Sequence, residues 1–232
     1  MKISDMTIDD LSERLILSVI NYNDSAERLL NFPHIRKGSF AVLTQLCMGD
    51  KNINGMYTTC LTVTNDMLNG WNISKEDMFD MATINSKNLF PAISEPVVSF
   101  LSGEGVQKFL DDNFDFSKIV VLSNKSFYNG VATIFYESDA LDKISKALDS
   151  NKIYIMASSV NHMYCIPENA GLSEEELQNI FKELSGAVEE NEKICDSILT
   201  YDSAQKRISE VEGQSYNLSL RTEQHTIQSN HR

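Results

Sequence analysis

The sequence predicts an α+β protein with antiparallel or mixed sheets, not a series of alternating β-α-β units. Short runs rich in β-branched and aromatic residues come in pairs separated by polar turns, as in hairpins. Helical periodicity is confined to separate stretches of the chain. We therefore expect two sheet-forming halves, one with strand-helix-hairpin order and one with β-β-α-β-β-α order, joined by a helical connection.

The first half is expected to open with a buried strand. Residues 14–21 are rich in Leu, Ile and Val, which favours a strand, although a helix beginning near Asp9 is the alternative. Asn23 or Asp24 can then cap a short helix. Pro33 stops that helix from continuing, because proline disfavours helical backbone in the residue before it.

Two hairpins are expected, one in each half. Residues 39–48 and 57–64 are β-rich runs separated by a polar, glycine-containing turn. Residues 118–123 and 131–136 form the second pair, and the dipeptide that begins at Asn129, Asn-Gly, is a typical hairpin turn.

A long helix and a helical connection are expected between the two hairpins. Ser74 and Asp77 resemble a capping box, and apolar residues follow at helical spacing until Pro91. Residues 106–110 predict another short helix after a glycine-rich turn. This connection is where we expect a hinge.

The rest of the second half is expected to add two helices and two strands. A helix is predicted over residues 139–148, followed by strands over 153–157 and 162–166. Ser173 and Glu176 form a capping box before a regular apolar stripe, which predicts an acidic carboxy-terminal helix.

We expect one α+β domain over residues 1–212, with possible sub-halves 1–113 and 114–212. Residues 213–232 are polar and lack periodicity. This composition predicts a flexible tail.

The charge of the chain excludes one class of partner. With 20 basic and 33 acidic residues, the net charge of −13 has the wrong sign for direct nucleic-acid binding or for attraction to an anionic membrane. No Walker, H-E-x-x-H or G-x-S-x-G motif occurs, so we expect no cofactor and no metal. The acidic first residues and the short apolar run after them predict neither a signal peptide nor a membrane span.

The cysteines predict a reducing compartment. They are widely spaced, lie among apolar neighbours and form no C-x-x-C pair, which is typical of reduced core thiols and not of zinc ligands or a disulfide framework. The four are Cys47, Cys60, Cys165 and Cys195. We therefore expect a cytoplasmic protein.

Much of the negative charge lies near the carboxy terminus. Residues 168–212 contain twelve acidic and four basic residues, a local balance of −8. Such a surface can steer a basic protein partner into contact, although acidity also simply favours solubility. The residues that would form the acidic contact surface are Glu174, Glu175, Glu176, Glu183 and Glu190.

One polar cluster between two predicted strands is a candidate for catalysis. Ser158 and Ser159 could supply a nucleophile and His162 a base, which would make the protein a small hydrolase. A structural turn is the alternative, because serine and asparagine favour turns for conformational reasons.

Two further features are candidates for binding. Trp71, the single tryptophan, could anchor a partner, or it could pack in the core. His34 is followed by Arg36 and Lys37, a basic spot that could receive a carboxylate or phosphate, or could be a solvated loop.

The order of several motifs adds a family resemblance. They are Asn21-Tyr22-Asn23, Pro33-His34, Trp71 before Ile73-Ser74, Asn85 with Pro91, Val121-Leu122-Ser123-Asn124, Gly130-Val131-Ala132, Ser158-Ser159 and Pro167. Over about residues 16–201 the chain resembles an uncharacterised bacterial family with a domain of unknown function, which is common in anaerobic gut bacteria and often associated with their integrative mobile elements. That family has His-Glu where this chain has Asn161 and His162, so no catalytic role is carried over.

Charge, motifs and resemblance together favour a cytoplasmic interaction protein. It would be an accessory or counter-defence factor of a mobile element that acts through its acidic surface on a basic protein surface. The alternative is the small hydrolase.

Overall fold

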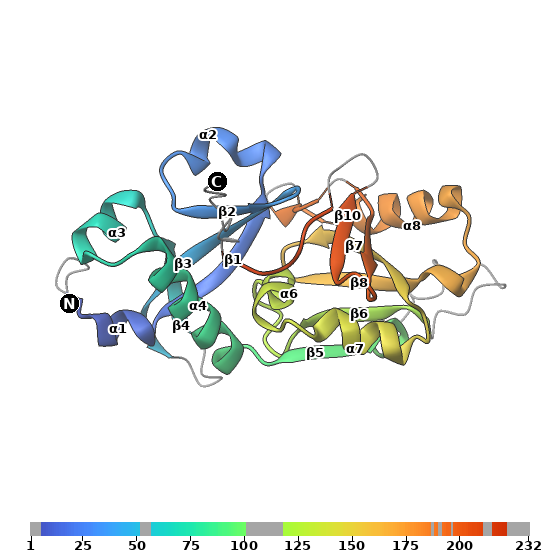
Figure 1. Ribbon diagram of the computed structural model, residues 1–232, viewed down its shortest axis with the longest axis horizontal. Helices are drawn as coiled ribbons and strands as arrows, with labels where there is room; N and C mark the ends of the chain where they lie inside the picture. Colours follow the sequence, from blue (N-terminus) through green and yellow to red (C-terminus); the bar gives the residue numbers. More distant parts are fainter. Residues whose placement is uncertain are drawn as a thin grey trace, which may run out of the picture.

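The computed structural model describes residues 6–51, 57–100, 118–186, 188–189, 192–195, 197–210 and 215–221. Two antiparallel sheets lie side by side with helices around them (Figure 1). The α+β class predicted from the sequence is confirmed. The predicted helix over residues 106–110, with its hinge, lies outside the described residues, as do residues 222–232 of the predicted tail.

Sheet A is built on the long strand β3 (Phe40–Lys51). Strand β1 (Leu15–Asn21) pairs along one side of it. Strands β2 (His34–Lys37) and β4 (Tyr57–Thr62) follow one another along its other side. The predicted first strand and first hairpin are confirmed. The sequence did not predict β2, because a short basic segment after a proline is typical of a solvated loop.

The helices of the first half are mostly short. Before the long one come α1 (Ile8–Ser12), the 3-10 helix η2 (Asn23–Ser25), α2 (Ala26–Leu29) and α3 (Asn65–Trp71). The predicted long helix is confirmed as α4 (Lys75–Leu89), with the expected serine as its N-cap. Both readings of the amino terminus hold in part, since α1 precedes the buried strand.

Helix α4 covers the free edge of β1 with hydrogen-bonding side chains. The Asn85 side-chain amide donates to the carbonyls of Glu13 and Leu15, at 2.8 and 3.0 Å. The Ser86 hydroxyl accepts from the N–H of Leu17 at 2.8 Å. A buried strand edge needs partners for its backbone groups, and these two side chains supply them.

Sheet B has six strands in the order β10-β9-β7-β8-β6-β5. They are β5 (Ala92–Pro96), β6 (Val120–Asn124), β7 (Lys152–Ser159), β8 (His162–Pro167), β9 (Leu199–Asp202) and β10 (Arg207–Glu210). The predicted strands at β6, β7 and β8 are confirmed. The sequence did not predict β5, β9 and β10, because these short segments have too few residues to show an alternating pattern.

Both faces of sheet B are covered. The helical segments of this half are α5 (Val97–Phe100), η5 (Gly130–Ala132), α6 (Thr133–Tyr136), α7 (Ala140–Ala147), η6 (Glu168–Ala170) and α8 (Glu174–Gly186). Successive residues of β7 alternate between a core shared with α7 and a smaller core under α8. The larger core extends into sheet A. The division of the chain into domains stays a prediction.

The predicted strand over residues 131–136 is wrong. This segment forms η5 and α6, and every residue from Val131 to Tyr136 is buried. Its uniformly apolar sequence lacks the periodicity that distinguishes a helix from a strand. The segment lies between the two sheets, where the Phe135 ring meets the edge of the Phe40 ring with centroids 6.2 Å apart.

The predicted tail is wrong for residues 215–221. Tyr216 and Ile208 exchange two backbone hydrogen bonds, at 2.9 and 2.8 Å. Tyr216, Leu218 and Leu220 pack against the main core. Their spacing of two residues turns one side of an otherwise polar extended segment toward the protein.

The prediction of four reduced cysteines is wrong for one pair. Cys47 and Cys60 form a disulfide, whereas Cys165 and Cys195 are free, buried thiols. The sequence separates the bonded pair by 13 positions, but the β3–β4 register places the two directly opposite each other. The disulfide removes one argument for a reducing compartment, since cytosolic proteins rarely contain them.

Replacing Cys60 with serine is expected to lower the free energy of unfolding by about 3 kcal/mol, because the cross-link closes a short loop in the unfolded chain. Urea unfolding monitored by circular dichroism measures the change. Dithiothreitol should lower the stability of the wild type to a similar extent and leave that of Cys60→Ser unchanged. A peptide map without reductant that shows a free Cys60 thiol would contradict the prediction.

Candidate functional site

The serine cluster proposed for catalysis forms a structural turn. Ser158 and Ser159 are buried at the end of β7, and the Ser158 hydroxyl has no hydrogen-bond partner among the described residues. The Ser159 hydroxyl accepts from the N–H of Asn161 at 3.0 Å. His162 begins β8 as predicted, but its Nε2 lies 3.1 Å from the Tyr164 hydroxyl. Ser159 and His162 are paired across the β7–β8 ladder, but the side-chain hydrogen bonds of the two residues go to Asn161 and Tyr164, so the hydrolase hypothesis lacks its nucleophile–base pair.

The environment of this turn also disfavours chemistry. Burial lowers the pKa of His162. The turn packs against the segment between the sheets, where Val131 donates its N–H to the Val160 carbonyl at 3.1 Å. The Ser123 hydroxyl donates to the Asn161 carbonyl at 2.6 Å. These contacts hold the β7–β8 turn against β6 and η5.

The acidic helix is confirmed as α8, but its glutamates form no single ridge. Glu174, Glu175, Glu176 and Glu183 are exposed, and Glu190 lies outside the described residues. Glu174 and Glu183 are nine positions apart, so they point about half a turn away from each other. Hydrogen bonds from the N–H and hydroxyl of Ser173 to Glu176 lower the pKa of that carboxyl. Glu176 therefore caps the helix.

Trp71 is placed by its burial. Its side chain is 9% exposed and belongs to the main core beside the end of α3. This is the packing alternative. So little accessible ring leaves Trp71 a poor anchor for a partner.

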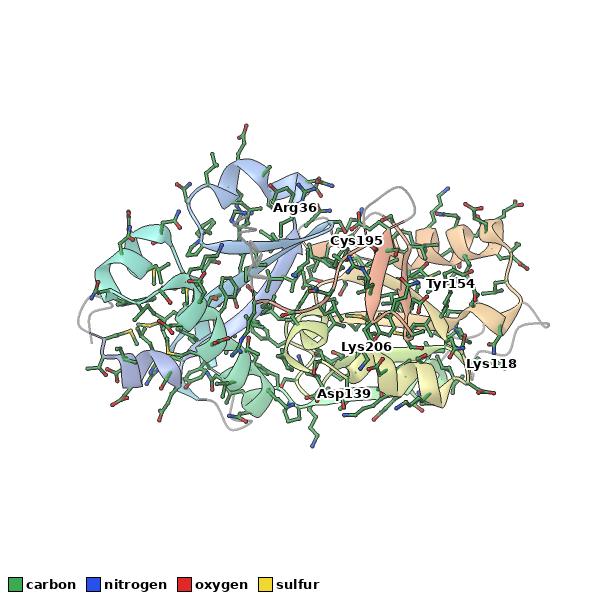
Figure 2. All side chains as sticks on the ribbon, in the orientation of Figure 1. Arg36, Lys118, Asp139, Tyr154, Cys195 and Lys206 are labelled. Atoms are coloured by element: carbon green, nitrogen blue, oxygen red, sulfur yellow. A yellow bond between two sulfur atoms is a disulfide. The ribbon has the colours of Figure 1, made fainter. Side chains whose placement is uncertain are left out.

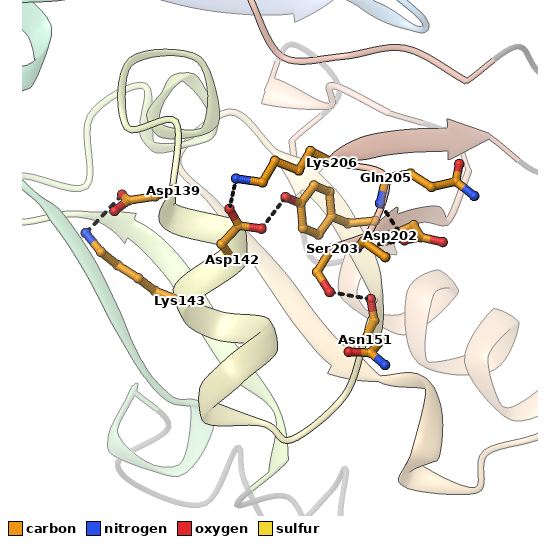
Figure 3. A network of polar contacts seen from close by, with 10 residues as sticks. Asp139, Asp142, Lys143, Asn151, Asp202, Ser203, Gln205 and Lys206 are labelled. Atoms are coloured by element: carbon orange, nitrogen blue, oxygen red, sulfur yellow. Dashed lines mark hydrogen bonds and ion pairs between the residues drawn. The ribbon is translucent and has the colours of Figure 1, made fainter.

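A second polar cluster links α7 to the β9–β10 hairpin (Figure 3). Asp142 accepts a hydrogen bond from the Tyr201 hydroxyl at 2.7 Å and lies 3.1 Å from the Lys206 ammonium. On the same helix, Lys143 lies 2.9 Å from Asp139. Burial and the Asp142 carboxylate raise the pKa of Tyr201, so its hydroxyl stays protonated. The cluster joins α7 to the β9–β10 hairpin.

The strongest candidate for a binding site is a groove with a volume of about 960 Å³. We call it the basic groove. It is lined by His34, Ile35, Arg36, Lys37, Lys75, Glu76, Phe79, Asp80, Arg207, Ser215, Tyr216, Asn217, Leu220 and Arg221. Five lysine or arginine residues face two carboxylates there, in a chain whose net charge is −13. The local balance of +3 is opposite in sign to the protein as a whole.

The groove is assembled from two parts of the chain that are distant in the sequence. Strand β2 and the first two turns of α4 come from the sheet A half, and β10 and residues 215–221 from the end of the chain. Residues 215–221 are tied to the first half at both ends. The Lys37 ammonium donates to the Asn217 side-chain oxygen at 3.3 Å, and Arg221 lies 3.2 Å from Asp80.

Three of the cations keep their charge available. Arg36 donates to the Gly38 carbonyl at 3.1 Å and lies 4.0 Å above the Tyr22 ring centre. Lys75 donates to the His34 carbonyl at 2.5 Å, and Arg207 binds the hydroxyl and carbonyl of Ser215. All these partners are neutral. Within the described part of the chain, none of the three cations has a carboxylate at ion-pair distance.

Apolar groups complete the groove. Phe79 is buried, and Ile35 and Leu220 are half-buried at its lining. Burial and the nearby Glu210 carboxylate raise the pKa of Tyr216, so this ring also presents a neutral surface. Arg36, which Figure 2 labels, lies on β2 and lines the groove where the sheet A half meets the end of the chain.

Sequence reasoning found only one part of this site. The spot formed by His34, Arg36 and Lys37 was visible, but the solvated-loop alternative was favoured. Lys75, Arg207 and Arg221 are isolated cations in the sequence, so no local signal associates them with the spot. Only the fold brings them together.

The described residues contain no helix that is long and apolar enough to cross a membrane. No group of three or more His, Cys, Asp or Glu side chains there is arranged to hold a metal ion.

Comparison with known proteins places the chain in a family. No curated protein and no solved structure matches it. The chain does match DUF5688, a family of unknown function, over residues 2–203. This match covers most of the 232 residues and confirms the resemblance to an uncharacterised family. The chain therefore belongs to the DUF5688 family of unknown function.

Proposed function

We propose that this protein is an interaction protein that holds an anionic segment of a partner in the basic groove. The observation that carries the proposal is the convergence of five cations, from four separate segments, in one groove of an acidic chain. A concave surface of one charge sign focuses the electrostatic field and attracts oppositely charged groups. The negative surface elsewhere repels polyanions, which favours a short acidic protein segment over nucleic acid.

The resemblance stated from the sequence gives this function a setting. In a bacterial mobile element, the protein would be an accessory or counter-defence factor that captures a protein of the host cell. A second candidate is contact through the acidic helix α8, whose Glu174, Glu175 and Glu183 are exposed and free for a basic partner surface.

Charge reversal distinguishes the two surfaces. The groove variant is Lys75→Glu with Arg221→Glu, and its matched control is Lys125→Glu with Lys146→Glu, which changes the net charge equally at exposed positions outside the groove. The helix variant, Glu174→Lys with Glu175→Lys and Glu183→Lys, spares Glu176 because that residue caps α8. Each protein is tagged and used for capture from a bacterial lysate at low and high salt, with mass spectrometry of retained proteins.

We expect a retained acidic protein that is lost at high salt and in the groove variant, and kept in the matched control and the helix variant. Loss at high salt follows from screening of exposed charges. A partner lost only in the helix variant would replace the groove by α8 as the contact surface. If the groove variant and its control retain the same proteins equally, the groove proposal is wrong.

A further inference from the structure

Strand β2 presents its backbone edge to the basic groove. All four of its residues, His34–Lys37, line the cavity. Side chains of a strand alternate between its two faces, so a cavity over one face would meet every second residue only. A cavity that meets four consecutive residues lies along the edge of the strand. On the other side β2 pairs with β3, and it is the last strand of the sheet there.

Cationic side chains satisfy carbonyl groups along this edge. The Lys75 ammonium donates to the His34 carbonyl at 2.5 Å, and Arg36 donates to the Gly38 carbonyl at 3.1 Å. The Lys75 contact reaches across from α4, so the His34 carbonyl faces the groove. An open strand edge is a template for another strand, and charged side chains guard it against unselective pairing. Here both side chains that donate to these carbonyls are positively charged.

We propose that the anionic segment binds as an added β-strand along the edge of β2. This inference rests on the proposed function and specifies its ligand, an extended acidic peptide. A peptide N–H would take the place of the Lys75 ammonium at the His34 carbonyl. The released ammonium would then pair with a carboxylate of the peptide, so that one exchange satisfies both the backbone and the charge.

The residues that line the groove determine which side chains a bound peptide strand would need. Side chains on one face of an added strand recur at every second residue. Lys75 and Arg207, which keep their charge available, line the groove around the edge and would meet acidic side chains at that spacing. The apolar lining at Ile35 and Leu220 would meet the residues between them. The preferred sequence therefore alternates acidic and apolar or β-branched residues.

Fluorescence polarisation with synthetic peptides tests the proposal on the full chain. The probe is a labelled peptide that alternates glutamate and valine. Two control peptides carry the same side chains but have alternate backbone nitrogens methylated, one on the edge toward β2 and one on the opposite edge. Methylation removes N–H donors and keeps the charge. We expect methylation on the edge toward β2 to weaken binding about thirtyfold, since the loss of two hydrogen bonds worth about 1 kcal/mol each corresponds to that factor. The Lys75→Glu variant should bind the unmethylated probe more weakly than the wild type does, and the Lys125→Glu variant should bind it as the wild type does.

The outcomes separate the binding mode from the function. If both methylation patterns leave the affinity unchanged while Lys75→Glu weakens it, strand addition is wrong and anion binding in the groove stands. If inorganic phosphate at equal concentration displaces the peptide, the groove is a small-anion site and strand addition is likewise wrong. A lysate partner that depends on the groove but does not compete with the probe also overturns the inference, without touching the proposed function.

Discussion

Replacing Gly130 with alanine is expected to destabilise the protein by about 3 kcal/mol, or to prevent folding. A Cβ atom at this position would overlap the Asn161 carbonyl group and the Ser123 hydroxyl. These two groups are hydrogen-bonded to each other at 2.6 Å and join β6 to the β7–β8 turn. Overpacking in a closely packed core commonly costs about 1 to 3 kcal/mol. We expect a value near the upper end here, because backbone atoms would have to move.

Gly70→Ala is the matched control for this substitution. Gly70 lies within α3, and a Cβ there would meet no atom within 4 Å. Alanine favours a helix over glycine by about 0.5 to 1 kcal/mol, so the control should be neutral or slightly stabilising. Urea unfolding of both variants provides the measurement. An unchanged unfolding midpoint for Gly130→Ala would show that the turn does not approach η5 this closely.

Replacing Asn85 with alanine is the second change with a large expected effect, about 2 kcal/mol of lost stability. The side chain is 9% exposed and its amide serves the carbonyls of Glu13 and Leu15 at the edge of β1. Removing the donor leaves the buried Leu15 carbonyl without this partner, which costs about 1 to 3 kcal/mol, whereas the Glu13 carbonyl keeps its hydrogen bond from the Tyr57 hydroxyl. Asn85 is thus a structural residue of the motif order that indicated the family.

The control for Asn85 lies on the same helix. Asn88 is exposed near the end of α4, so Asn88→Ala should change the free energy of unfolding by less than about 0.5 kcal/mol. Hydrogen exchange adds a local readout, because the amide of Leu17 is bonded to the neighbouring Ser86 hydroxyl at 2.8 Å. We expect faster exchange along β1 in Asn85→Ala. Equal stability of the two variants would mean that α4 does not seal this edge.

The elements that sequence reasoning predicted are those with local physical causes. Helix α8 was predicted because Ser173 and Glu176 cap each other and the apolar residues after them repeat at helical spacing. Strands β7 and β8 were predicted because each is long enough to show the β-branched and aromatic residues that favour a strand. The strand predicted over residues 131–136 was wrong because a run that is buried on every side shows no periodicity, and its sequence therefore does not distinguish a helix from a strand.

The candidate site shows the same division more sharply. The basic spot at His34, Arg36 and Lys37 is contiguous in the sequence, so the local sequence indicates it. Its interpretation as a loop was wrong because β2 gains strand geometry only by pairing with β3. Glu174, Glu175 and Glu176 of α8 are also contiguous, but Glu183 lies nine positions after Glu174, and helix geometry points these two in opposite directions.

The sequence by itself determined the fold class, the sign of the overall charge and the helices with their own caps and stripes. The overall charge is a sum over the chain, and helix caps and apolar stripes depend on residues within a few positions of each other. The tertiary structure alone decided the Cys47–Cys60 disulfide, the burial of the serine turn and the convergence of Lys75, Arg207 and Arg221 on β2. Each depends on strand register or on packing between distant segments, and local sequence encodes neither.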